Sequence, residues 1–293
     1  MHDPNYGKPA PKAAYRGLIV SSPVTVNGSS FSGNSNLDPQ ELRFSLLFWD
    51  KLVWPTGLIS FGSNETEEQL VKCGVMERPR YNHHGGSGDI ILAGQLQAFN
   101  DYNERDPGAW ALAQGPNSLK VLGKATELNQ GGALIELCRA IPIPSANVPI
   151  NEILELKERR RDELLRFRLH MEGLSELIAQ SSEKTEQLEA HLKEINSACS
   201  DLMALGKDWQ WPMQITTMNA SLDLKPELVG QVIGAWEFGE KFCTELAAAS
   251  AAAVGLYNGV KINRHFKLRL RSPKHPSTPY RYAYHIHREL GEI

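Results

Sequence analysis

Short apolar runs alternate with helical patterns over the first third of the chain. Residues 16–23 are predicted to form a buried strand, because a short apolar run there is closed by a proline. Residues 38–50 are predicted to form a helix, with Asp38 as its N-cap and a proline in its first turn. Residues 51–55 have the pattern of a second strand, whereas residues 21–36 are rich in Ser, Gly and Asn and are predicted to be a loop. Strand, crossover helix and strand together predict a parallel pair.

The second half of the chain is predicted to contain a helical hairpin and a pair of strands. Apolar residues recur at helical spacing over 151–180 and 183–206, and only two serines join these segments. Residues 142–150 are rich in proline and favour a domain boundary before the hairpin. Apolar and polar residues alternate over 261–271, and tyrosines alternate at the start of 280–290, so these two segments are predicted to form a strand pair.

These elements predict an α/β fold with three regions. Residues 1–150 form an α/β domain that begins with a strand–helix–strand region. Residues 151–206 form a protruding antiparallel helical hairpin. Residues 207–293 form a C-terminal α+β region whose strands return to the sheet and pack on the first domain.

The composition is that of a globular protein with a locally basic tail. Of the 293 residues, 41% are hydrophobic and 22% are charged, and the formal net charge is -3. Residues 258–293 contain eight Lys or Arg and two Glu, so the tail is basic and the preceding residues are acidic. This asymmetry favours a polyanion or an acidic protein as a partner.

Cysteine usage and hydropathy favour a cytoplasmic protein. The four cysteines lie far apart, so neither a zinc motif nor a disulfide framework is recognisable. The N-terminal residues lack the apolar core of a signal peptide, and no apolar run reaches the length of about 18 residues that a membrane-spanning helix needs. We therefore expect a cytoplasmic chain that binds no cofactor and does not enter a membrane.

Three segments resemble those of an uncharacterised family of bacterial proteins known only as a domain of unknown function. They are SLLFWDKL (45–52), INEILELKERRRDELLRFR (150–168) and PYRYAY (279–284). Such families often lie in mobile or phage-defence gene neighbourhoods, so the resemblance implies an antiviral defence system of several proteins. It implies no catalytic motif and no site residues.

The basic tail carries the first candidate binding site. In an extended 261–271 segment, one face is apolar and the other is cationic. Cations interleaved with the tyrosines of 280–290 are suited to hold a nucleic-acid backbone and to stack bases. The alternative is an ordinary solvated strand face, because edge strands carry Lys and Arg to avoid aggregation. The cations assigned to this site are Lys261, Lys267, Arg269, Arg271 and Arg281.

The predicted hairpin carries a second group of cations. Lys157, Arg161 and Arg168 point within about 40° of one another on a helical wheel and span roughly 16 Å, which is long enough to follow several phosphates. The alternative is a solvated helix face, because residues 151–206 carry more acidic than basic side chains.

A fourth cation of the hairpin, Arg160, falls in the middle of the apolar stripe. We predict that Arg160 is more buried than Arg159 or Arg161, because it alone lies on the packing face. Its guanidinium group either reaches past the contact between the two helices to water, pairs with Asp201 at the same height of the hairpin, or binds a ligand.

The stretch YNHHGGSGD (81–89) is the candidate for metal chemistry. His83 and His84 precede two glycines, so the loop could present metal ligands, whereas no Walker pattern is present. The alternative is a flexible surface loop, because adjacent histidines on an extended backbone point in opposite directions.

The sequence as a whole favours a non-enzymatic interaction protein. We expect a subunit of a multi-protein system that binds nucleic acid or an acidic partner through its tail and a protein through its hairpin. A homo-oligomer is compatible with this hypothesis. A metal-dependent nuclease or phosphodiesterase that uses residues 83–89 is the alternative, although no paired-carboxylate motif supports it. Catalytic activity itself stays an open question at this point.

Overall fold

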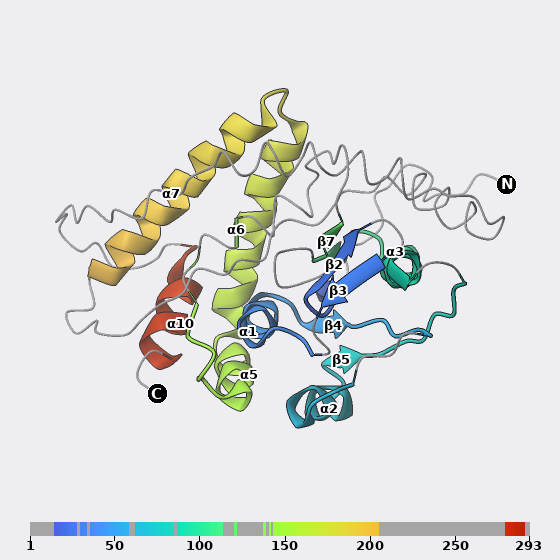
Figure 1. Cartoon of the computed structure of the whole chain (residues 1–293). Helices are drawn as coiled ribbons and strands as arrows, with labels where there is room; N and C mark the ends of the chain where they lie inside the picture. Colours follow the sequence, from blue (N-terminus) through green and yellow to red (C-terminus); the bar gives the residue numbers. More distant parts are fainter. Residues whose placement is uncertain are drawn as a thin grey trace, which may run out of the picture.

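The described part of the chain is a mixed α/β structure. The structure is a computed structural model, and it describes residues 15–27, 30–33, 36–58, 62–84, 87–113, 120–121, 137–138, 141, 143–204 and 279–290. These residues form a parallel sheet with helices on both faces, a smaller sheet and a group of helices beside them (Figure 1). The predicted fold class is therefore confirmed at this level.

Four parallel strands form the central sheet, in the order β5–β4–β1–β6. They are β1 (Gly17–Ile19), β4 (Lys51–Val53), β5 (Met76–Glu77) and β6 (Trp110–Leu112). Gly17 lies opposite Lys51 in the β1–β4 pair, so the predicted parallel pairing is confirmed. All three residues of β1 are buried, as expected for a central parallel strand covered on both faces.

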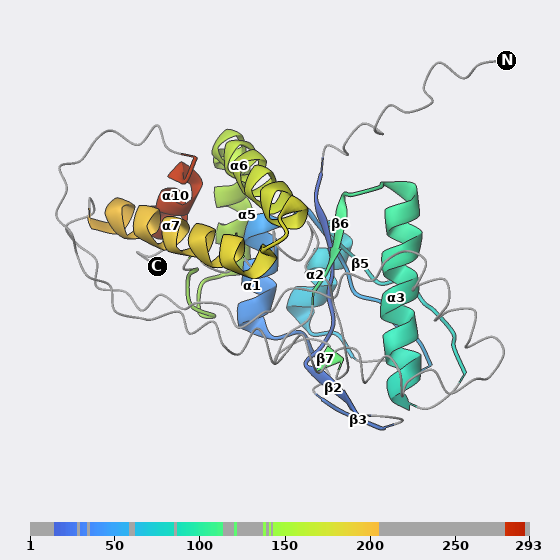
Figure 2. The same cartoon turned by 90° about the horizontal axis from the view of Figure 1, so that it is seen from above.

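Helices cover both faces of this sheet. Figure 2 shows α1 and α3 on opposite sides of the strands. The Asp38 side chain accepts hydrogen bonds from the backbone N–H groups of Gln40 and Glu41, which confirms it as the N-cap of α1. The sheet helices are α1 (Pro39–Phe48), α2 (Glu65–Lys72) and α3 (Ser87–Arg105).

A second, three-stranded sheet corrects the loop prediction for residues 21–36. Its strands are β2 (Val24–Asn27), β3 (Ser30–Gly33) and β7 (Lys120–Val121). β2 and β3 are antiparallel, with Val26 opposite Phe31, and β7 is parallel to β2. The overlooked signal is the Gly-Ser pair between the paired residues Asn27 and Ser30, because Gly-Ser is a sequence that favours a two-residue hairpin turn.

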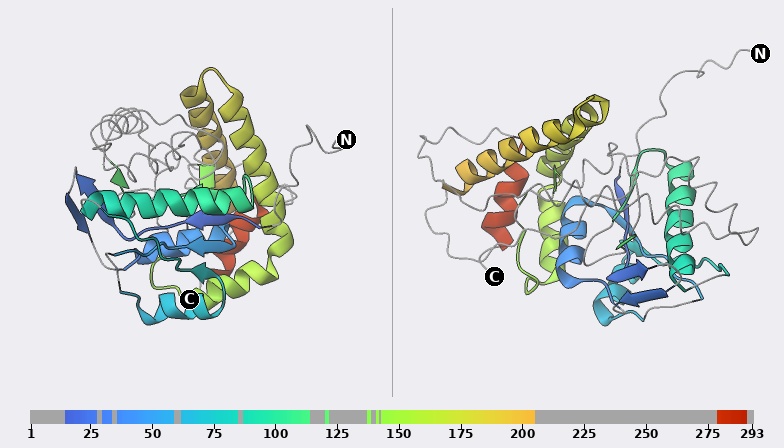
Figure 3. Two further views of the ribbon diagram at one scale, coloured as in Figure 1. Left: turned by 90° about the vertical axis from the view of Figure 1, so that its right-hand side faces the viewer. Right: turned by 45° about the horizontal axis from the view of Figure 1, so that its top comes forward.

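Four helices form the remainder of the described structure. They are α5 (Ile150–Arg159), α6 (Arg161–Gln180), α7 (Lys184–Ala204) and α10 (Arg281–Leu290). α6 and α7 contact each other and form a hairpin that rises above the central sheet (Figure 3). The buried residues Leu188, Ile195 and Cys199 lie on α7 and belong to the core that also includes α6 residues.

The segment 151–180 is two helices rather than one. Arg160, at φ −110° and ψ 27°, ends α5 and precedes α6. α5 contacts α1 and α6 contacts α7, whereas α10 contacts both halves.

The helix α10 (Arg281–Leu290) takes the place of the strand predicted at 280–290, so that prediction is wrong. The tyrosines at the start alternate as in a strand, but the buried residues Tyr282, Ile286 and Leu290 recur every fourth position. That spacing places them on one helix face. The other half of the predicted strand pair, 261–271, lies outside the described residues.

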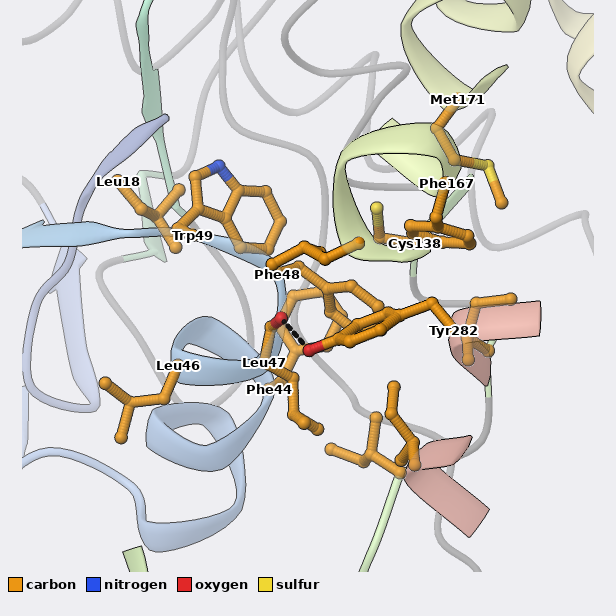
Figure 4. Close-up of a cluster of buried hydrophobic side chains, with 14 of the residues drawn as sticks. Leu18, Phe44, Leu46, Leu47, Phe48, Trp49, Cys138, Phe167, Met171 and Tyr282 are labelled. Carbon is orange, nitrogen blue, oxygen red and sulfur yellow. Dashed lines mark hydrogen bonds between the residues drawn. The ribbon is translucent and has the colours of Figure 1, made fainter. Parts of the chain in front are cut away.

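One continuous hydrophobic core joins the sheet to the helices. Phe48 of α1, Phe167 of α6 and Tyr282 of α10 meet with ring centroids 5.6 to 6.3 Å apart (Figure 4). The Tyr282 hydroxyl donates a hydrogen bond of 2.9 Å to the Leu47 carbonyl oxygen. The predicted division into domains at residues 150 and 206 stays a prediction, although this core extends across the first boundary.

Candidate functional site

A row of apolar residues lies on the outer face of α6. Leu165, Leu169 and Leu177 expose 40%, 70% and 58% of their surface. Gly173, which is also exposed, occupies the one remaining position of the same four-residue spacing. We call these four residues the α6 stripe, and residues spaced by four are neighbours on a helix surface.

The opposite side of α6 is already occupied. Leu164, Phe167 and Met171 are buried in the core that α6 shares with its neighbours. Among the described residues, the other large apolar side chains with comparable exposure are Leu58 and Val71, on two different segments. The α6 stripe is therefore a second apolar face on a helix that has already buried one.

Two cations of the predicted hairpin group lie inside the protein, around Asp50. Arg168 donates hydrogen bonds of 2.6 and 3.1 Å to the two oxygens of the Asp50 carboxylate. The ammonium group of Lys157 lies 3.7 Å from the same carboxylate and donates to the Leu46 and Trp49 carbonyl oxygens. These two cations thus neutralise a carboxylate of the chain itself.

Burial and charge shift the pKa values of this cluster in opposite ways. Burial raises the pKa of Asp50, but the hydrogen bond and charge of Arg168 and the charge of Lys157 outweigh it, and the net pKa is lowered. Burial lowers the pKa of Lys157 to about 7, although Asp50 opposes the change. The cluster is therefore a buried structural ion pair of Asp50 and Arg168 with a lysine that is about half protonated near pH 7.

The third cation of that group, Arg161, does face solvent, and the order of burial around it is as predicted. The side chains of Arg159, Arg160 and Arg161 are 55%, 31% and 69% exposed, so Arg160 is the most buried of the three. Arg160 pairs with Glu289 of α10 at 2.5 Å. The side chain of Asp201, which was considered as its partner, lies outside the described residues.

A polar cluster surrounds this pair where α10 meets the break between α5 and α6. His285 lies 3.1 Å from Glu289 and 3.9 Å from Glu163. Burial and the charge of Arg160 lower the pKa of His285. Arg281, the one cation assigned to the tail site that the structure describes, is partly exposed and lies 4.0 Å from Glu163.

The other cations assigned to the tail site are Lys261, Lys267, Arg269 and Arg271, and they lie outside the described residues. Their role in binding a polyanion stays a prediction. The structure does show that the predicted groups differ in kind, because Lys157 and Arg168 are internal whereas Arg161 is exposed.

The histidine loop does not gather metal ligands among the residues described. His83 is half-buried, and burial lowers its pKa, whereas its neighbour His84 is exposed. In that part of the chain, no three His, Cys, Asp or Glu side chains lie close enough to hold a metal ion. The metal-dependent alternative stays a prediction that rests on residues beyond this part.

A small cavity lies at the carboxyl ends of β1 and β4, where open parallel sheets often bind ligands. Ser21, Ser22, Thr56, Tyr81 and Gln95 contribute polar groups to its wall. Its volume of about 20 Å³ accommodates about one ordered water. The cavity is too small to support a small-molecule function.

Comparison with known proteins gives a family and no activity. A model of the family of unknown function DUF6236 matches residues 13–291, which confirms the resemblance to a domain of unknown function. No curated protein and no solved structure matches the chain. Among the described helices, none combines the length and the apolar character needed to cross a bilayer.

Proposed function

We propose that this chain, which belongs to the DUF6236 family of unknown function, is a non-catalytic interaction protein that binds an apolar protein helix through the α6 stripe. The observation that carries the proposal is the exposure of three leucines in one row on a helix whose other side is buried. Rows of exposed apolar side chains on a folded protein mark contact surfaces. Full burial of a leucine stabilises a complex by about 1.5 to 3 kcal/mol.

The shape of the α6 stripe favours a helix as its occupant. Residues four apart form a ridge that fits the groove between the ridges of another helix. Apolar helix faces are recognised in proteins through anchors at such spacings. Arg161 and Arg166, exposed beside the stripe, give it the polar rim that protein interfaces have.

The basic tail is the second contact surface of the proposal. Its excess of six positive charges over residues 258–293 supports binding to nucleic acid or to an acidic protein. Participation in a bacterial defence system and a cytoplasmic location remain predictions that rest on the family resemblance and the composition.

Site-specific photo-crosslinking in native cells tests the proposal. A photoreactive amino acid at Leu169 is expected to give a discrete protein adduct that mass spectrometry identifies, and Leu165→Gln with Leu177→Gln in the same chain should abolish it. The matched control places the amino acid at Lys193, an exposed position of α7 away from the stripe. Absence of an adduct from position 169, or equal adducts from both positions, contradicts the proposal.

A further inference from the structure

We propose that the helix bound by the α6 stripe is α6 of a second copy of this chain, crossing the first antiparallel about a two-fold axis between Leu169 and Gly173. The inference rests on the proposed function, because it names the partner of the same surface. It makes the protein a homodimer whose interface is isologous, so that each copy contributes the same residues.

Gly173 is the first reason, because the single chain does not require a glycine there. It lies inside α6, and a Cβ atom added to it meets nothing within 4 Å. An exposed glycine within a helix costs about 1 kcal/mol relative to alanine. The close approach of a second backbone would explain a residue without a side chain at this position.

The symmetry of the stripe is the second reason. Its four members are spaced evenly, so reversing the helix direction exchanges Leu165 with Leu177 and Leu169 with Gly173. Antiparallel pairing therefore places Leu169 of each copy over Gly173 of the other. A large side chain meets a small one at both central positions, as close packing between helices requires.

The winding of the stripe sets the crossing. Residues four apart follow a ridge inclined to the helix axis, and two such ridges pack into each other at about −50°. At that angle the helices are closest at the centre and diverge toward both ends. The glycines then occupy the point of closest approach, and the longer side chains of Leu165 and Leu177 fill the widening flanks.

The polar residues beside the stripe agree with the same pairing. The two-fold axis that places Leu165 beside Leu177 of the second copy also places Arg166 beside Glu176 of that copy. Each Arg166 is then on the same side of the crossing as Glu176 of the second copy. Parallel pairing would instead place like charges together, which is unfavourable.

The mass of the purified full-length chain tests the inference. Light scattering or sedimentation over about a hundredfold range of concentration should show a species of twice the 32.6 kDa chain mass. Leu169→Gln should raise the dimer dissociation constant by at least about tenfold. The control Leu58→Gln removes a leucine of similar exposure elsewhere and should leave it unchanged.

Gly173→Leu distinguishes this specific helix crossing from nonspecific association of the apolar surface. The variant adds apolar surface, so a nonspecific patch would associate more tightly, whereas the proposed crossing loses its close approach and dissociates at least about tenfold more readily. Its helix should stay intact by circular dichroism, because the added side chain meets open space in the single chain. A wild type that is monomeric throughout, or a Gly173→Leu variant that dimerises as well or better, overturns the inference.

The two proposals fail in different ways. An adduct from position 169 to another protein, with a monomeric purified chain, supports the proposed function and overturns the second copy as partner. An adduct of twice the chain mass, with crosslinks mapped to residues 169–177 of the second chain, supports both.

Discussion

Asp50 lies where α1 ends and β4 begins, and its carboxylate connects three parts of the chain. It accepts a hydrogen bond of 3.0 Å from the backbone N–H of Arg16 and binds Arg168 and Lys157 of the helical region. A buried cation without its counterion is costly, because the interior cannot replace the lost hydration. The position of one carboxylate therefore decides that two cations of α5 and α6 are structural.

Replacing Asp50 with asparagine should lower the free energy of unfolding by about 3 kcal/mol, because the variant leaves the buried guanidinium of Arg168 without its counterion. Urea denaturation measures the change. Glu158→Gln, which affects only the exposed pair with Arg161 at 3.9 Å, is the control and should change stability by less than about 0.5 kcal/mol. Equal stability of Asp50→Asn and wild type contradicts the structural role of the cluster.

Lys157 gives the folded protein a defined dependence on pH. Because its pKa is lowered to about 7, the folded chain releases this proton above pH 7, whereas the unfolded chain keeps it to about pH 10. The unfolded state then binds more protons, so the free energy of unfolding rises with pH, by at most about 1.4 kcal/mol per unit. Lys157→Met should lack this rise between about pH 7 and 8.5, as measured by denaturation curves at several pH values. Identical slopes of unfolding free energy against pH in both proteins would contradict the assignment of this titration to Lys157.

Tyr282 joins the helices α10 and α1, because its hydroxyl donates a hydrogen bond to the Leu47 carbonyl oxygen. Tyr282→Phe should reduce the free energy of unfolding by about 1 to 2 kcal/mol, because the Leu47 carbonyl loses its 2.9 Å hydrogen bond in a buried place. Tyr284→Phe is the matched control on the same helix, where the ring is only partly buried, and should change stability by less than about 0.5 kcal/mol. Thermal unfolding of both variants decides between them, and similar losses would show that the hydrogen bond contributes little.

Elements with local signals were predictable from the sequence. β1, α1 and β4 combine a short apolar run with a capped helix, so the parallel unit and the role of Asp38 followed directly. α10 was misassigned because three alternating tyrosines resemble a strand, whereas the four-residue spacing of Tyr282, Ile286 and Leu290, which fits a helix face, was overlooked.

The candidate site was less predictable from the sequence than these elements. On a helical wheel, Lys157, Arg161 and Arg168 look alike, and only Asp50, more than a hundred residues earlier, separates the buried pair from the exposed arginine. The leucines of the α6 stripe were equally hidden, because an apolar residue in a sequence does not reveal whether its neighbours cover it. Exposure is a property of the whole fold, and a single helix pattern does not contain it.

At the scale of the whole molecule, the two proposed surfaces act together. A dimer formed through the α6 stripe would carry two basic tails, and the second tail would bind a polyanion at a raised local concentration once the first is bound. The proposed interface and the proposed tail site are thus linked, and salt should weaken tail binding much more than it weakens the apolar α6 crossing.

Nucleic-acid binding by the tail is the last expectation to test. Changing Lys267, Arg269 and Arg271 together to glutamine should reduce affinity for a short duplex DNA by about 1 kcal/mol per lost contact, by analogy with charges near an anionic surface. Binding of the wild type should also weaken steeply with salt, because each neutralised phosphate releases counterions. Lys193→Gln is the matched control, since this exposed cation of α7 pairs with Glu189 at 3.8 Å and belongs to neither proposed polyanion site, and its effect should be small. Fluorescence anisotropy at low salt measures all three proteins, and equal affinity of wild type and triple variant contradicts a polyanion site. An acidic protein would then be the remaining partner for a tail with six excess positive charges.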